Sequence, residues 1–362
     1  MDTQLQLSEN LYPVDEVIGS FVQSILTRKS LHECLYWLWE LIMSTPNVAD
    51  GLTVIYRQFY ASSSSNLGRY VSRKVSAYLL SGDIRCLADI VANLRTSKYT
   101  GTAYLLARYS EKPTASTIYR RQSWMVGYHP KATQILGALK SRDLENISWH
   151  CNIFSNHNGN QITMQVIRQY ATNQGIDIND GIDGRYDTQD TLQICAALAR
   201  IFDHPPWDVR ERFVRAPADM VQEMERHFTK NSDKYWKKLT ERRLYPTHSI
   251  MPPGAYGRDS VDDLRKASQL HWEYYCYDSI EWKTRFEKYE GSKNDIDKSI
   301  VFKDDDCLEN FYEDDNCMDF DEQPRDVQNM SLHPIQVITD PKQWLEIVRN
   351  AELESHMQDM TM

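Results

Sequence analysis

Apolar residues recur at helical spacing between residues 14 and 43, with one polar interruption in the middle. Val17, Phe21 and Ile25 lie four residues apart, and the pattern resumes at Leu31. Residues at this spacing share one face of an α-helix. Because the polar break is only a few residues long, the pattern predicts two antiparallel helices joined as a hairpin.

The same break recurs twice more along the chain. A residue that caps helices followed by an apolar residue appears as Ser30-Leu31, Asp83-Ile84 and Asp143-Leu144. The Ser or Asp oxygen accepts a hydrogen bond from a free backbone N–H of the helix that follows. The apolar residues are 53 and 60 residues apart, so the spacing does not fit a strict solenoid. With only 14 Gly and 13 Pro, the chain is predicted to be all-α, an irregular array of antiparallel helical hairpins.

Turn-forming residues and charge divide the chain into three predicted parts. Residues 1–155 contain the hairpins, and a stretch rich in Asn, Asp and Gly follows them. Residues 156–290 form a second helical region, whose longest helix is expected at 261–289. Residues 291–362 are acidic and poor in aliphatic side chains, which predicts a partly disordered tail with a helix at its end.

The predicted terminal helix begins after Asp340, which caps it, with Pro341 at its first position. An amphipathic helix behind an acidic linker is typical of a docking segment for a protein partner. The expected docking residues are Trp344, Leu345, Ile347 and Val348. The alternative is that this helix packs back onto its own fold.

Charge is distributed unevenly. Residues 57–121 hold eleven Lys and Arg against three Asp and Glu, whereas residues 304–322 hold ten acidic residues and no basic ones. Basic side chains interleaved with aromatic rings suit nucleic acid, because cations neutralise phosphates and rings stack on bases. An acidic partner, or the chain's own acidic tail, is the other candidate for this block, and a solvated helix face with snorkelling arginines is the plain alternative. The candidate binding residues are Arg57, Arg69, Tyr70, Arg73, Lys74, Arg108, Tyr109, Arg120, Arg121 and Trp124.

The sequence contains no complete catalytic signature. It lacks the glycine-rich loops that hold nucleotide phosphates and the Gly-x-Ser-x-Gly turn of α/β hydrolases. Residues 179–190 resemble a calcium loop, but an Asn and a Gly occupy its first and third ligand positions. His150, Cys151 and His157 offer too few ligands for zinc and are interpreted mainly as core residues. We therefore expect no catalytic residue, no metal and no cofactor, and a small-molecule ligand is not expected.

Seven cysteines are scattered without a Cys-x-x-Cys pair, which predicts reduced thiols and a cytoplasmic protein. The first ten residues carry acids and amides where a secretory signal needs a basic start and an apolar run. No uncharged apolar stretch approaches the eighteen residues of a membrane span. We expect no membrane association.

Two resemblances add to this interpretation. Residues 17–24 together with Leu35-Tyr36-Trp37-Leu38 resemble the helical collar of clamp-loader-type recombination proteins, with residues 14–43 as the matching hairpin. That resemblance implies related helical packing, but no ATPase activity, since the ATPase module is missing. Residues 33–37, 272–278 and 320–324 resemble uncharacterised helical proteins of large nucleocytoplasmic DNA viruses, which implies a setting in the host cytoplasm or virion.

The sequence therefore favours a non-catalytic helical scaffold or interaction protein, a component of a virion or virus factory with a protein partner. The alternative is an accessory protein of DNA replication or packaging that binds nucleic acid through the basic block.

Overall fold

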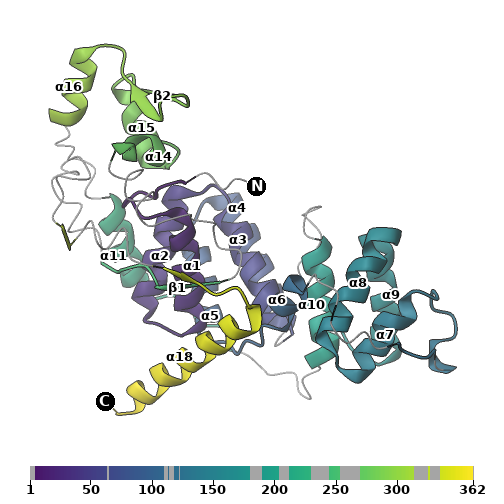
Figure 1. Cartoon of the computed structure of the whole chain (residues 1–362). Coiled ribbons are helices and arrows are strands. Elements are labelled where there is room, and N and C mark those ends of the chain that lie inside the picture. Colours follow the sequence, from purple (N-terminus) through teal and green to yellow (C-terminus); the bar gives the residue numbers. More distant parts are fainter. Residues whose placement is uncertain are drawn as a thin grey trace. The chain divides into compact units, whose positions relative to one another are not determined.

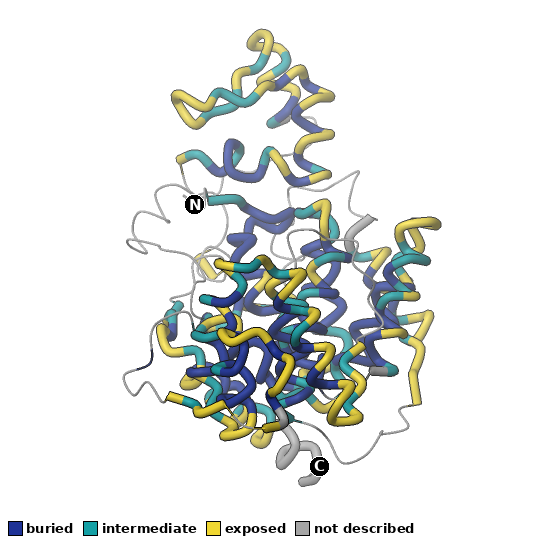
Figure 2. The backbone as a smooth tube through the Cα atoms, turned by 90° about the vertical axis from the view of Figure 1, so that its right-hand side faces the viewer, coloured by how far each residue is buried: buried dark blue, intermediate teal, exposed yellow. Residues whose placement is uncertain are grey.

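The computed structural model confirms a predominantly helical fold with a few very short strands (Figure 1). It describes residues 5–62, 65–109, 113, 118–121, 123–179, 190–203, 212–229, 244–252, 270–313, 325–326 and 335–361. Buried and exposed residues alternate along the helices, as expected of amphipathic helices that each bury one face (Figure 2). Among the described residues, no helix has the length and apolar character needed to cross a membrane.

The chain forms two compact units. Unit 1 comprises Met1–Val48 and Ala216–Met362, and unit 2 comprises Ala49–Arg215. These units do not follow the three segments predicted from the sequence. The boundary expected after residue 155 falls inside helix α8 (Leu144–Asn158), which packs against the helices on either side of it and so joins the two predicted regions.

Unit 1 begins with the predicted hairpin of α1 (Val14–Leu26) and α2 (Leu31–Ser44), which pack against each other. The turn uses Arg28 at a φ of 55°, and the Ser30 hydroxyl accepts from Glu33 N at 3.1 Å, as the capping pattern predicted. Helix α11 (Ala218–Thr229) packs against α2, and α18 (Pro341–Thr361) packs against α1. Strand β1 (Ile250–Met251) pairs in parallel with β4 (Gln336–Val337).

The long helix predicted at 261–289 is not continuous. Residues 261–269 lie outside the described residues, and the remainder forms α14 (Trp272–Cys276) and α15 (Ile280–Lys288). Between them Ser279 adopts an extended conformation, with a ψ of 149°, and its N–H donates to Cys276 O. The break places Trp282 of α15 against Trp272 of α14, with ring centroids 4.8 Å apart. Tertiary packing of the two indole rings accompanies a bend that helical spacing did not reveal.

The first part of the predicted acidic tail is ordered around an aromatic core. Residues 291–313 form the antiparallel pair β2 (Ser292–Asn294) and β3 (Ser299–Val301) and helix α16 (Asp305–Glu313). Phe311 of α16 is buried and stacks on Phe286 of α15 at 4.9 Å. Leu7 and Leu11 from the start of the chain belong to the same cluster. The acidic residues 314–322 lie outside the described part of the chain.

Unit 2 is built from helices that follow one another in sequence. They are α3 (Val48–Ile55), whose first residue ends unit 1, the π-helix η1 (Tyr56–Tyr60), α4 (Ser65–Ser81), α5 (Arg85–Thr96), α6 (Thr102–Arg108), the 3₁₀-helix η2 (Ser123–Met125), α7 (Ala132–Ser141), α8, α9 (Asn160–Asn173) and α10 (Asp190–Asp203). Sequential pairs pack together, including α4 with α5 and α7 with α8, so the second and third predicted hairpins are present.

The caps of these two hairpins differ in detail. Asp143 Oδ1 accepts from Asn146 N at 3.1 Å, which is the cap that the sequence predicted for α8. Asp83 Oδ1 accepts instead from Arg85 N at 3.0 Å, two residues on, because α5 begins at Arg85 with Ile84 at the cap position. Both carboxylates bond a backbone N–H at the start of a helix, where its dipole favours negative charge.

Candidate nucleic-acid interface

Four of the predicted binding residues lie close together on α4. Arg69 and Arg73 are exposed, Lys74 is half-buried and Tyr70 is 6% exposed. Residues 69 and 73, like 70 and 74, are four positions apart and so lie on neighbouring parts of one helix face. The Arg73 guanidinium and the Lys74 ammonium lie 5.6 and 5.8 Å from the centre of the Tyr70 ring. These distances are in the range of cation–π attraction.

A residue distant in sequence completes this arrangement. Phe213, in the segment that follows α10, stacks on Tyr70 with ring centroids 4.3 Å apart and ring planes inclined by 19°. Tyr70 is nearly covered, while 36% of Phe213 remains exposed. In the stacked pair Tyr70 is thus the inner residue, which also lies beside the cations of α4, and Phe213 is the outer residue, which is partly open to solvent.

Asn93 of α5 holds the segment that carries Phe213. Its buried carboxamide donates from Nδ2 to Val214 O at 2.8 Å and accepts from Val214 N at Oδ1 at 2.9 Å. One side chain thus satisfies both backbone polar groups of Val214, as a neighbouring strand would. Asn93 Nδ2 also donates to Asp89 O, at 2.6 Å, which fixes the amide on its own helix. Phe213 and Arg215, the residues on either side of Val214, are positioned by this clamp.

The charges of this region are coupled. Lys74 Nζ lies 2.6 Å from Asp89 Oδ2. Desolvation lowers the pKa of Lys74, but the hydrogen bond and charge of Asp89 outweigh it, so the pKa is raised above its usual value. Burial raises the pKa of Tyr70, assisted by Asp89 and opposed by Lys74, Arg73 and Arg215.

We call this region the α4 basic surface. It consists of Arg69, Tyr70, Arg73, Lys74, Phe213 and Arg215. Asp89 offsets Lys74, so the exposed positive charge rests mainly on the three arginines. Arg69 Nη2 donates to Asn66 Oδ1 at 2.5 Å, which orients its guanidinium on the helix surface.

The other predicted binding residues do not join this surface. Arg57 is 2% exposed and lies in the π-helix η1, so its guanidinium is part of the interior. Arg108 is exposed on α6, with Cζ 5.4 Å from the Tyr104 ring centre. Tyr109 is half-buried, Arg120 and Arg121 are exposed, and Arg121 Nη2 donates to Met125 O at 3.5 Å. The side chain of Trp124 lies outside the described residues.

Sequence reasoning missed Phe213, Arg215 and their clamp Asn93. The string Arg212-Phe213-Val214-Arg215 carries the same alternation of basic and aromatic residues that drew attention to α4. That signal was available from the sequence. The stacking of Phe213 on Tyr70, by contrast, joins residues far apart in the chain, and no local pattern indicates it.

The apolar face of the predicted docking helix is buried within unit 1. Trp344, Leu345 and Val348 are at most 1% exposed and Ile347 is half-buried. Helix α18 packs against α1, and Arg28 Nε lies 2.8 Å from Glu352 Oε1. This supports the alternative in which the helix packs on its own fold, because the apolar face proposed for a partner is covered.

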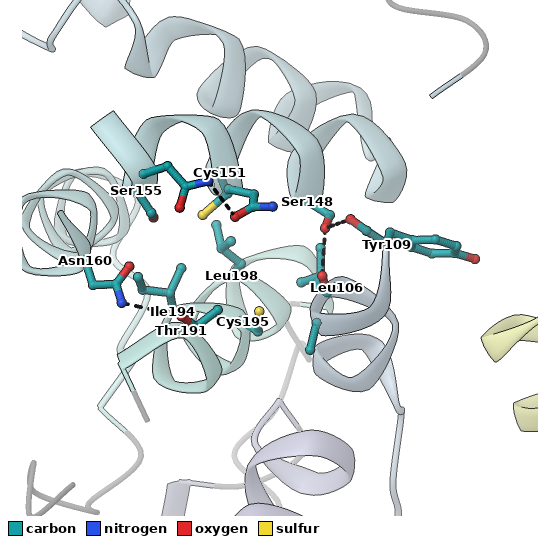
Figure 3. A pocket seen from close by; sticks show the side chains of 13 residues that line it. Leu106, Tyr109, Ser148, Cys151, Ser155, Asn160, Thr191, Ile194, Cys195 and Leu198 are labelled. Carbon is teal, nitrogen blue, oxygen red and sulfur yellow. Dashed lines mark hydrogen bonds between the residues drawn. The ribbon is translucent and has the colours of Figure 1, made fainter. Parts of the chain in front are cut away.

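An open pocket lies between α6, α8, α9 and α10, with a volume of about 180 Å³ (Figure 3). Leu106, Ile194 and Leu198 supply apolar walls. The rest of the lining is uncharged and consists of Tyr109 and smaller side chains, several of which are amides and hydroxyls. Ser148 at one end donates to Leu106 O at 2.7 Å and to Tyr109 O. Two thiols, Cys151 and Cys195, also line it.

These thiols are not poised for reaction. Burial raises the pKa of Cys151 to about 12, with the Ser155 hydrogen bond acting in the opposite direction, and burial also raises the pKa of Cys195. A thiol held protonated is a poor nucleophile. In the described part of the chain, the cysteines at positions 34, 86, 151, 195, 276 and 307 form no disulfide bond.

The metal-binding alternatives raised by the sequence find no geometric support in the described residues. Burial lowers the pKa of His150 despite the nearby charge of Asp143, and His157 Nδ1 lies 2.7 Å from Ile153 O. Within the part of the chain that the structure describes, no three His, Cys, Asp or Glu side chains converge to hold a metal ion. Most of the calcium-like segment, residues 180–189, lies outside that part.

No protein-family model, no curated protein and no solved structure matches this chain. The resemblances to viral proteins and to the clamp-loader collar therefore stay predictions.

Proposed function

We propose that this protein is a non-catalytic helical interaction protein that binds nucleic acid through the α4 basic surface. The observation that carries the proposal is the approach of Arg73 and Lys74 to Tyr70, whose ring stacks on Phe213, with the exposed Arg215 two residues further along the clamped segment. A solvated helix face would explain exposed arginines on α4. It would not explain why an arginine and an exposed aromatic ring from a distant segment are clamped beside them.

The chemistry of the surface fits a phosphate backbone. Guanidinium groups bind phosphates through paired hydrogen bonds and keep their charge at any physiological pH. Residues 65–96, which form α4, α5 and the turn between them, and residues 212–215 together contain seven Lys and Arg and two acidic residues, Asp83 and Asp89. This local excess of positive charge contrasts with the net charge of −10 of the whole chain. The positive potential is therefore a property of one region, as binding to a polyanion requires.

The proposal retains the interaction role predicted from the sequence and assigns it a partner. The predicted setting in the host cytoplasm or the virion of a large DNA virus is part of the same proposal and rests on the sequence resemblance alone. An acidic protein segment is the competing partner, since arginines bind carboxylates as well as phosphates.

Binding can be measured by fluorescence anisotropy of labelled oligonucleotides across a salt series. We expect an affinity that falls linearly on a logarithmic plot against salt, because bound phosphates release counterions. Arg73→Glu should weaken binding by about tenfold and reduce the slope by roughly one or more. Arg168→Glu is the matched control, since Arg168 is an exposed arginine on α9 of the same unit.

Two outcomes would contradict the proposal. Binding without salt dependence, or an equal loss in Arg168→Glu, would show that the α4 basic surface has no special role. Polyglutamate of the same charge is a further competitor in this assay. If it displaced the oligonucleotide at equal charge concentration, an acidic protein would be the better partner.

A further inference from the structure

We propose that the α4 basic surface binds the single-stranded form of nucleic acid, with an unpaired base stacking on Phe213. The inference rests on the proposed function and names the class of ligand for the same surface. Its starting point is the unequal exposure of two stacked rings, 6% for Tyr70 and 36% for Phe213.

The inner ring acts as a support for the outer one. Tyr70 is packed within unit 2, and its ring lies nearly parallel to that of Phe213 at 4.3 Å. The Asn93 clamp on Val214 fixes the backbone next to Phe213 from a buried position. Phe213 is thus a large exposed aromatic side chain with its position set before any ligand arrives. Preorganised aromatic rings lose little conformational entropy on binding.

An exposed aromatic ring beside cations is the arrangement that single strands require. Every base has a π-face that can stack on a phenyl ring, while arginines track the backbone phosphates. Arg73 and Lys74 lie 5.6 and 5.8 Å from the centre of the Tyr70 ring, and Arg215 follows Phe213 by two residues. A strand whose base stacks on Phe213 would place its neighbouring phosphates in the region that carries Arg73, Lys74 and Arg215.

A duplex gains less from this geometry. Its bases stack on one another, so their faces are closed, and exposing one costs a few kcal/mol of unstacking. A duplex offers the surface only its phosphates, and it leaves the exposed part of Phe213 without a partner. The same arginines thus bind both forms, and the ring distinguishes them.

The test compares three ligands of equal phosphate count in the full-length protein. These are a labelled 20-nucleotide oligothymidine or oligouridine, an abasic strand of the same length, and a duplex with the same total number of phosphates. We expect the strand with bases to bind more tightly than the other two. Phe213→Leu, which keeps apolar packing on Tyr70, should weaken its binding by about 5- to 150-fold, the range for loss of one stacked base. Phe213→Trp should retain binding.

A second readout does not depend on affinity. Ultraviolet cross-linking of an oligonucleotide containing bromodeoxyuridine, mapped by mass spectrometry, should modify the peptide that contains Phe213. The Phe213→Leu variant should show an unchanged thermal transition, so that lost binding is not lost folding, and Arg168→Glu should cross-link like the original protein.

The inference and the proposed function fail differently. If all three ligands bound equally, with a salt-sensitive affinity that Phe213→Leu left unchanged, single-strand stacking would be overturned while phosphate binding stood. If no ligand bound with salt-sensitive affinity, the proposed function itself would fall. A cross-link confined to α9 or another distant helix would also overturn the inference.

Discussion

The two units of this protein are stabilised in contrasting ways. Unit 2 is one continuous stretch of chain, and its core cluster within residues 103–201 is mostly aliphatic and includes Ile135, Leu136 and Leu198. Unit 1 is assembled from two distant stretches, and one of its core clusters is rich in aromatic rings, among them Trp272 and Trp282, and joins Leu7 and Leu11 to residues 272–311. Unit 2 also has contacts between distant residues, such as Thr102 with Asp203 and Asn93 with Val214, which are 101 and 121 positions apart. Unit 1 depends on contacts between residues more than two hundred positions apart.

Those distant contacts are specific hydrogen bonds. Trp282 Nε1 donates to Glu9 O at 3.0 Å, and the Tyr12 hydroxyl donates to Tyr245 O at 2.7 Å. The Thr247 hydroxyl donates to the buried carboxylate of Glu16 at 2.8 Å. Buried polar groups must be paired, so each of these bonds helps to fix which segment lies against the start of the chain. The difference teaches that apolar spacing forms the hairpins, whereas polar pairing assembles unit 1.

The largest expected effect comes from truncating the aromatic core of unit 1. Trp282→Ala should lower the free energy of unfolding by about 3–5 kcal/mol through cavity formation. Because the indole also bonds Glu9 O, protection of residues 5–26 should fall together with that of residues 270–313. Hydrogen exchange of the full-length protein measures both stretches at once.

Phe154→Ala provides the matched truncation in the aliphatic core of unit 2, where Phe154 is 1% exposed. Its effect should be confined to residues 123–203. If either variant lowered protection evenly in both units, the two would unfold as one cooperative block, and the contrast between them would be structural but not energetic.

Alkaline pH tests the core of unit 2 next. Because burial raises the thiol pKa of Cys151 and of Cys195, the folded chain keeps both protons at pH values where the unfolded chain loses them. The unfolded state then binds fewer protons, so the free energy of unfolding falls as pH rises above the usual thiol pKa. We expect a loss of about 1.4 kcal/mol per thiol between pH 8 and pH 10.

Urea denaturation at a series of pH values measures this slope. The double variant Cys151→Ala and Cys195→Ala should be less stable at pH 8 but should lose less on going to pH 10. An unchanged slope in the double variant would assign the alkaline loss to other groups.

The smallest expected effects compare the helix caps of the two units. Asp143 accepts from Asn146 N, from Asn146 Nδ2 at 2.7 Å and from the Tyr119 hydroxyl at 3.1 Å, whereas Ser30 is an uncharged cap at an exposed turn. Asp143→Ala should therefore cost about 1–2 kcal/mol and Ser30→Ala about 0.5–1 kcal/mol. Thermal denaturation ranks them, with Asp143→Asn and Ser30→Thr as controls that keep an acceptor. A larger loss of stability in Ser30→Ala than in Asp143→Ala would contradict this ranking of the two caps.

Much of the local structure was predictable from the sequence. The spacing of Val17, Phe21 and Ile25 predicted α1, and Ser30 and Asp143 marked the first residues of α2 and α8, because capping and amphipathicity act within a few residues. The predicted helix at 261–289 was wrong at Tyr277–Ser279, although its apolar spacing continues through the break. Helical periodicity does not distinguish one long helix from two helices that fold onto each other.

The candidate site was predictable in part. Arg69 and Arg73 are exposed as the basic pattern suggested, but Arg57 carries the same sequence signal and is buried. Phe213 and Arg215 were missed, since nothing local connects them to Tyr70. The apolar residues of α18 were predicted as a docking face, but Trp344, Leu345 and Val348 are buried and the helix packs against α1 of the same chain.

The sequence by itself determined the helices, their caps and the uneven distribution of charge, because those depend on residues within one or two turns of each other. Only the tertiary structure decided which charges are exposed, which aromatic rings are covered and which distant segments meet. The stacking of Phe213 on Tyr70 shows why. Each ring is compatible with many partners, and the choice among them follows from the packing of α5 and the single amide of Asn93, which no local pattern encodes.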